Sequence, residues 1–364
     1  MPGRPLTAVL AAALVAAACT SEGGDGVALP TTTGGATTSI ASTTTEPTSP
    51  PTTESLLEPE RRTTDPRLVV DACLSDVEAP VGLQTSVLVS GGVDYTFQWT
   101  VPSGYEGQAL PVVLDFHDIG NTGADQGRLS GLAALAETEV FLAVQPTAPT
   151  TANDPRSAWE LAVFDEPGRD DVAFVLDLLD HLGGKTCLDQ DRIYATGMGN
   201  GGFFVSTLVC EIGSRLAAAV SVAGVTEPDA CDPNRTVPYL AFHGTADEIV
   251  PIQGGTAVSG EGDAELERFF EQPIPDAFAS LASLAGCLDS VDEQITESVT
   301  LRAFGGCPDS ATVGLYTVSG GGHTWPGSAE SELMPHLGPT DSSIDATRIA
   351  LEFLFANALA SAGE

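Results

Sequence analysis

The feature that most constrains the fold of this chain is its alternation of strand-like and helix-like segments. The short apolar runs Pro111–His117 and Val140–Val144 are typical of buried strands, whereas Asp171–Lys185 carries apolar residues at helical spacing. Such alternation over this length predicts a mostly parallel central sheet with helices on both faces. Further strands are expected at Arg192–Thr196, Ala218–Val222, Pro238–His243, around Val299 and at Val313–Val318, and further helices from Asn200 toward Ile212, at Asp276–Ala285 and from Asp341 or Ser342 onward.

The N-terminal part of the chain differs in composition from the region that carries this alternation. Residues 1–18 hold Arg4 and then an apolar run that is too short to span a bilayer, as in a signal peptide. Residues 19–66 are rich in Thr, Ser and Pro with almost no apolar periodicity, which predicts an extended tether. Residues 67–364 then have the size of one α/β domain.

Cys19 stands at the end of the apolar run, directly after three alanines. This arrangement resembles a bacterial lipobox, except that Ala16 occupies the position where leucine is usual. We predict a lipid anchor at Cys19, and the alternative is cleavage after Ala18, which would leave an unpaired thiol. Both readings predict an exported protein, either extracellular or held at the cell envelope.

The charge of the chain excludes several classes of partner. Fourteen Lys and Arg face 50 Asp and Glu, a formal net charge of −36. A chain this acidic repels phosphate backbones and anionic lipid surfaces. We therefore predict no nucleic-acid partner, and contact with a membrane only through the anchor at Cys19.

The cysteines of residues 67–364 predict crosslinks rather than a metal site. Six cysteines in an exported domain suggest three disulfides, although six permit fifteen connectivities. Neighbours in sequence favour Cys210–Cys231 and Cys287–Cys307, which leaves Cys73–Cys187 by elimination. None of these cysteines has the paired short spacing of a zinc site, so no metal is expected.

Three loops that follow predicted strands carry a family resemblance: Thr196–Gly202, His243–Pro251 and Gly320–Gly327. In order and spacing they resemble the exported α/β-hydrolases known as polyhydroxybutyrate depolymerases, feruloyl esterases and acetylxylan esterases. The resemblance covers most of the chain from about Val81 onward, and four of the six cysteines stand where many members of that family have cysteines. It implies the α/β-hydrolase fold and the hydrolysis of carboxylic esters without a cofactor.

The resemblance also assigns catalytic positions, and one of them has lost its side chain. Such a site needs a nucleophilic serine, a histidine base and a carboxylate that orients the histidine. His323 matches the base and Asp247 the acid, whereas the nucleophile position at the centre of the Gly-x-Ser-x-Gly motif is Gly199. Glycine tolerates the positive φ of that tight turn but offers no oxygen for attack.

A second departure lies on the side of the oxyanion hole, the pair of donors that stabilises the negative oxygen of the intermediate. The family usually carries His-Gly after the strand that corresponds to Pro111–His117, and here Asp118 follows His117. A carboxylate near a developing oxyanion would oppose it. If Asp118 points to solvent, the amides of Ile119 and Asn200 can still form the hole, and the sequence leaves that direction open.

Two functions follow from these residues. The first is a carboxylic-ester hydrolase that is catalytically impaired at Gly199. The second is a non-catalytic pseudoenzyme on the cell envelope that binds an ester or polysaccharide ligand. A purely structural role for His323, or a turn role for Asp247, is the alternative to both, and the surrounding motifs favour the catalytic positions.

Overall fold

The structure, a computed structural model, describes residues 79–150, 156–161, 169–228, 231, 235–255 and 272–359. The predicted signal peptide, the tether, Cys19 and Cys73 lie outside the described residues. Among the described helices, none is long and apolar enough to cross a membrane.

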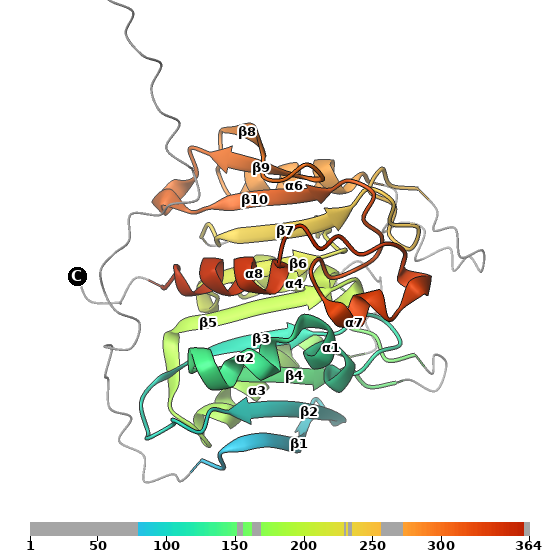
Figure 1. The fold of residues 1–364 in the computed structure, drawn as a ribbon. Helices are drawn as coiled ribbons and strands as arrows, with labels where there is room; N and C mark the ends of the chain where they lie inside the picture. The colour runs from blue at the N-terminus through green and yellow to red at the C-terminus, as the bar shows by residue number, and fades with distance from the viewer. Residues whose placement is uncertain are drawn as a thin grey trace, which may run out of the picture. The chain divides into compact units, whose positions relative to one another are not determined.

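Ten strands form a single sheet. They are β1 (Gly82–Ser90), β2 (Val93–Val101), β3 (Leu110–Phe116), β4 (Leu142–Thr147), β5 (Leu188–Met198), β6 (Ala218–Val222), β7 (Tyr239–Gly244), β8 (Asp289–Gln294), β9 (Val299–Gly305) and β10 (Val313–Val318). Their spatial order is β1-β2-β4-β3-β5-β6-β7-β10-β9-β8 (Figure 1). The central strands from β4 to β10 are parallel, and antiparallel strands extend the sheet at both edges.

Burial along the strands explains this division. Every residue of β3, β6 and β7 is buried, as expected for strands covered on both faces. β1 instead alternates between exposed and partly buried residues, and all of β8 is exposed. The parallel centre is therefore the core of the domain, and the antiparallel edges are its margins.

Helices cover both faces of the sheet (Figure 1). They are α1 (Gly123–Ser130), α2 (Leu132–Glu139), α3 (Asp171–Gly183), α4 (Asn200–Glu211), α6 (Ile274–Leu284), α7 (Ala329–Glu332) and α8 (Ala346–Phe355). Helices α3, α4 and α6 share one apolar core with the sheet, and α1, α2 and α8 share the other. The predicted α/β architecture with helices on both faces is thus confirmed.

The structure differs from the sequence prediction mainly at the margins. Strands β1, β2 and β8 and helices α1 and α2 were not predicted. The predicted start of the last helix at Asp341 or Ser342 is wrong, because α8 begins at Ala346. Asp345 is its N-cap and accepts a hydrogen bond from the amide of Arg348 at 3.0 Å.

Two disulfides join elements on the face that carries α4 and α6. Cys210 at the end of α4 is bonded to Cys231, and Cys287, which follows α6, is bonded to Cys307. Both pairs are those predicted from their neighbourhood in sequence. Cys187 is disulfide-bonded as well, and its predicted partner Cys73 lies outside the described residues.

Candidate active site

The four positions singled out in the sequence follow the carboxyl ends of four parallel strands in the centre of the sheet. Strands β3 and β5 are neighbours, β7 and β10 are neighbours, and β6 lies between the two pairs (strand order in Figure 1). Asp118 follows β3, Gly199 follows β5, Asp247 follows β7 and His323 follows β10. Loops at this end of a parallel sheet meet, so residues far apart in sequence come together there. Below, Asp247 and His323 are called the acid–base half of the site, and Asp118 and Gly199 the nucleophile half.

Gly199 adopts the strained turn that the motif requires. Its φ of 52° and ψ of −118° lie in a region that favours glycine, and its amide donates to the carbonyl of Val222 at 2.9 Å. The flanking glycines leave no room for a side chain, because a Cβ on Gly201 would overlap the carbonyl of Phe116 and a Cβ on Gly197 would lie 2.6 Å from the carbonyl of Gly201. The tight connection from β5 to α4 is therefore intact.

The acid–base half has the geometry of a working pair. Nδ1 of His323 lies 2.9 Å from Oδ2 of Asp247, and both side chains are buried. Oδ1 of Asp247 accepts hydrogen bonds from the amides of Ile249 and Val250 at 2.9 and 2.8 Å, which fixes the carboxylate. The backbone amide of His323 donates to the carbonyl of Leu337 at 2.7 Å, so its loop is held as well.

In the nucleophile half, Asp118 points into the site and not to solvent. Its Oδ2 lies 3.1 Å from Nε2 of His323. Its Oδ1 accepts hydrogen bonds from the amides of Ile119 at 2.7 Å and Asn200 at 2.8 Å. These are the two amides predicted to form the oxyanion hole, and here the carboxylate of Asp118 occupies them.

The carboxylate of Asp118 also fills the space beside Gly199. A Cβ placed on Gly199 would overlap this carboxylate and would lie 2.8 Å from its Oδ2. Asp118 therefore stands where a side chain at position 199 would stand. The glycine at 199 and the aspartate at 118 fit each other sterically.

The charges in the site are strongly coupled. Burial alone would lower the pKa of His323, but the hydrogen bonds to and the charges of Asp118 and Asp247 outweigh it and raise this pKa to about 10. Burial likewise favours the neutral form of Asp118, but the partner His323 and the two amides hold its pKa below the usual range. At neutral pH the site thus holds an imidazolium between two carboxylates.

Two further residues support this arrangement. His117 is buried, and its Nε2 accepts the amide of Ala148 at 3.0 Å, so its Nδ1–H donates to the carbonyl of Asp118 at 2.6 Å. The side chain of Asn200 accepts the amide of Trp159 at 2.6 Å and donates to its carbonyl at 3.2 Å. His117 is therefore a loop-positioning residue, and the side chain of Asn200 ties the start of α4 to Trp159.

Two further residues close to these motifs in sequence, Trp325 and Ser206, take structural roles. Trp325 is fully buried and its Nε1 donates to Thr347 at 2.9 Å, which makes it a packing residue. The hydroxyl of Ser206 is bonded to that of Tyr239 at 2.9 Å and takes no part in the site. Both ring nitrogens of His323 face carboxylates, so no described serine, threonine or cysteine is bonded to it. The described residues contain no cluster able to hold a metal ion.

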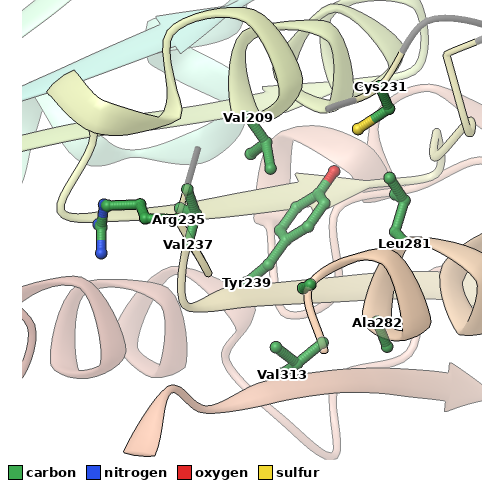
Figure 2. A pocket seen from close by; sticks show the side chains of 9 residues that line it. Val209, Cys231, Arg235, Val237, Tyr239, Leu281, Ala282 and Val313 are labelled. Carbon is green, nitrogen blue, oxygen red and sulfur yellow. The ribbon is translucent and has the colours of Figure 1, made fainter. Parts of the chain in front are cut away.

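A small cavity lies apart from these residues, between α4, β7 and α6 (Figure 2). Its volume is about 20 Å³, enough for one water molecule. The side chain of Tyr239 reaches into it, and its hydroxyl is already bonded to Ser206 and Ser221. None of Asp118, Gly199, Asp247 and His323 lines this cavity. It is a packing gap in the core.

Comparisons with known proteins place this geometry in a family, although no family model matches the chain. The chain is 28% identical to "Feruloyl esterase B" of Piromyces equi over 231 residues, which are 61% of this chain and 41% of that protein. Among solved structures, the acetyl xylan esterase from Aspergillus awamori has a TM-score of 0.51 at 14% identity, covering 70% of this chain and 98% of the other, and shows the same fold.

A second relative is "Putative esterase NocK" of Nocardia uniformis subsp. tsuyamanensis. The chain is 30% identical to it over 269 residues, which are 70% of this chain and 76% of that protein. The described residues supply the corresponding frame: a parallel sheet, a strained turn after β5 and an acid–base pair after β7 and β10. The chain therefore belongs to the esterase family of NocK, within the α/β-hydrolase fold.

Proposed function

We propose that this chain is a carboxylic-ester hydrolase whose serine-type catalysis is impaired, because position 199 supplies no nucleophilic oxygen. The observation that carries the proposal is the placement of Asp118, which occupies both the space of a residue-199 side chain and the two amides of the oxyanion hole. Loss of the serine from such a triad costs orders of magnitude in rate.

The protonation state of His323 supports the same conclusion. A general base must be unprotonated at the operating pH, and this imidazole is held in its charged form by Asp118 and Asp247. A water molecule that approaches the site thus finds no free base. The amides of Ile119 and Asn200 are likewise already engaged, so they cannot stabilise an oxyanion without displacement of Asp118.

The names of the relatives suggest the chemical class of the substrate. One relative is called a feruloyl esterase, and the structural neighbour is an acetyl xylan esterase. Both names denote hydrolysis of acyl groups, in the second case acyl groups on a polysaccharide. We propose an acylated polysaccharide, or a fragment of one, as the class of ester substrate for this type of site. The chain spans about two fifths of the length of "Feruloyl esterase B".

The location follows from the crosslinks and the N-terminal sequence. The disulfides Cys210–Cys231 and Cys287–Cys307 fit an oxidising compartment. They support an exported protein at the cell envelope or outside the cell. The lipid anchor at Cys19 and the tether of residues 19–66 stay predictions from the sequence.

The experiment that tests the proposed function is repair of the nucleophile half. A Gly199→Ser variant alone should stay inactive, because the new side chain would overlap Asp118. The double variant Asp118→Gly/Gly199→Ser should hydrolyse p-nitrophenyl acetate at least about 10³-fold faster than the unaltered chain, since it restores a serine beside His323 and empties the hole. It should also be labelled at residue 199 by an organophosphate.

The matched control is Asp118→Gly/Gly199→Ala, which has the same backbone and an empty hole but lacks the hydroxyl, and which should stay inactive. A folded double variant that neither turns over the ester nor takes the label would contradict the proposal and favour the non-catalytic binding protein. Rapid ester turnover by the unaltered chain, abolished by His323→Ala, would contradict it in the other direction.

A further inference from the structure

The two departures from the esterase pattern concern the same place in the site. Position 199 lacks a side-chain oxygen, and Asp118 puts a carboxylate oxygen there instead. A side chain has disappeared at Gly199, and the carboxylate of Asp118 has entered the volume that it would fill. Oδ2 of Asp118 lies 3.1 Å from Nε2 of His323, which is hydrogen-bonding distance. A potential nucleophile and a histidine thus still face each other, with the nucleophile on the loop after β3.

The two oxygens of Asp118 are in different surroundings. Oδ1 is held by the two backbone amides, at 2.7 and 2.8 Å, whereas Oδ2 has His323 as its hydrogen-bond partner. The side chain of Asp118 is 12% exposed, compared with 1% for His323 and 0% for Asp247. Asp118 is therefore the most exposed of these three side chains.

We propose that Asp118 is a covalent nucleophile toward substrates with an electrophilic sp³ carbon and a leaving group that departs as an anion. In the first step Oδ2 forms a bond to that carbon, and the bond to the leaving group breaks with its electron pair. Asp118 becomes a neutral alkyl ester, and the leaving group departs as the anion. Oδ1 becomes the ester carbonyl oxygen and already lies between the amides of Ile119 and Asn200.

The second step is hydrolysis of that ester. Alkylation removes the negative charge of Asp118, so His323 loses one of the two carboxylates that hold its proton, and the proton passes to solvent. Neutral His323, oriented by Asp247, takes a proton from water as the water oxygen adds to Cγ of Asp118. The charge that develops on Oδ1 is stabilised by the two amides.

Collapse of this intermediate completes the cycle. The alkoxide leaves Cγ and takes the proton from His323, which yields the alcohol and the acid form of Asp118. That acid returns its proton to His323 and restores the ion pair. The net reaction converts the alkyl substrate and one water into an alcohol, the leaving-group anion and a proton.

The same nucleophile is poorly suited to carboxylic esters. Attack of Asp118 on an acyl carbon would have to expel an alkoxide to leave an anhydride. The carboxylate is the better leaving group of the two, so the intermediate reverts. The inferred activity therefore goes beyond the proposed function and concerns a different bond, which makes the two separable by experiment.

The first test uses the unaltered chain, 1-bromobutane as the probe and water enriched in ¹⁸O. Because water adds to Cγ, repeated turnover should place ¹⁸O in the carboxylate of Asp118, detected by mass spectrometry of the peptide that contains it. Formation of labelled butanol without ¹⁸O in Asp118 would mean direct attack by water and would overturn the proposal, as would the absence of any butanol above the buffer rate.

The second test traps the intermediate. A His323→Gln variant lacks the base for the second step, so one butyl group should accumulate on Asp118. The label should be lost in His323→Gln/Asp118→Asn and kept in His323→Gln/Asp125→Asn, which removes a partly exposed carboxylate at the start of α1 as the matched control. Butylation that is unaffected by Asp118→Asn would overturn the proposal. Neither test involves ester turnover by the repaired double variant, so each proposal can fail without the other.

Discussion

The acid–base half and the nucleophile half of the site both contact the imidazole of His323, but the two contacts differ in their effect on the ring. On the Nδ1 side, Asp247 holds His323 as an orienting carboxylate, fixed by two amides of its own loop. On the Nε2 side, the ring meets the carboxylate of Asp118, where an esterase presents an uncharged hydroxyl. The first contact orients the ring, and the second helps to raise the pKa of His323 and so favours its charged form. This is the contact on which the proposed impairment rests.

This difference shows that the side chains of such a site can depart from the esterase pattern while the backbone that positions them stays the same. Gly197 and Gly201 still allow the close approach of β5, α4 and β3, and the backbone amides still converge. Two positions account for the change: Gly199 has no side chain, and the carboxylate of Asp118 lies where a side chain at 199 would stand. The chemistry of the site thus depends on Asp118 and Gly199, whereas its geometry depends on the glycines around them.

At a fixed pH, the largest effect on stability is expected from the glycines of the frame. A Gly201→Ala variant should lose about 3 kcal/mol or more of unfolding free energy, because its Cβ would overlap the backbone carbonyl of Phe116. Gly199→Ala should lower the unfolding free energy less in the Asp118→Gly background than in the unaltered chain, because the added Cβ overlaps the side chain of Asp118. Urea denaturation of the single variants and of Asp118→Gly/Gly199→Ala measures the coupling. Equal costs for Gly199→Ala in both backgrounds would contradict the steric pairing.

The next effect is on the pH dependence of stability and comes from the shared imidazole. The pKa of His323 is raised from 6.5 to about 10 in the folded protein, so its contribution is complete below pH 6.5 and is lost as the pH rises toward 10. Relative to His323→Gln, the unaltered chain should lose about 1.4 kcal/mol per pH unit across that window. In an Asp118→Asn variant the pKa of His323 should be raised less, because Asp247 is then the one carboxylate partner that remains. The pH range over which stability is lost should therefore be narrower. Parallel stability curves for the unaltered chain and His323→Gln would contradict the ion pair.

The smallest effect is expected where the nucleophile half is fastened to its surroundings. An Asn200→Ala variant loses both side-chain hydrogen bonds to Trp159 and should cost about 1–2 kcal/mol in unfolding free energy. Asn200→Asp keeps the acceptor for the Trp159 amide and should lose less. Thermal unfolding compares the two, and a larger loss for the aspartate variant would show that the acceptor does not carry the contact.

The frame was predictable from the sequence because its signals are local. Buried apolar runs and helical spacing each occupy a few consecutive residues, and the parallel centre follows from them. The acid–base half was assigned by the resemblance of its two loops to those of the esterases. The hairpin of β1 and β2 also had a local signal that was overlooked. Gly91 and Gly92 form its two-residue turn, with φ of 58° and 82°, between strands of alternating pattern.

The direction of Asp118 had no such signal. The residue stands on a loop where both solvent and the site are within reach of its side chain, and nothing in its neighbours along the chain decides between them. The decision is made by donors that arrive from elsewhere, the amide of Asn200 on α4 and Nε2 of His323 after β10. Asp118 and Asn200 are 82 positions apart in the sequence, and Asp118 and His323 are 205 positions apart. Such contacts can be recognised only after the strands have been assembled into the sheet.

The overlap between Asp118 and position 199 also restricts the order in which such a site can change over generations. A lineage that regained serine at 199 while it kept aspartate at 118 would meet a steric clash before it met any benefit. The reverse order first removes the carboxylate of Asp118 and so empties the space that a side chain at 199 needs. Because a serine at 199 would overlap the side chain of Asp118, the order of the two substitutions is fixed. Asp118 has to be replaced before serine can return at position 199.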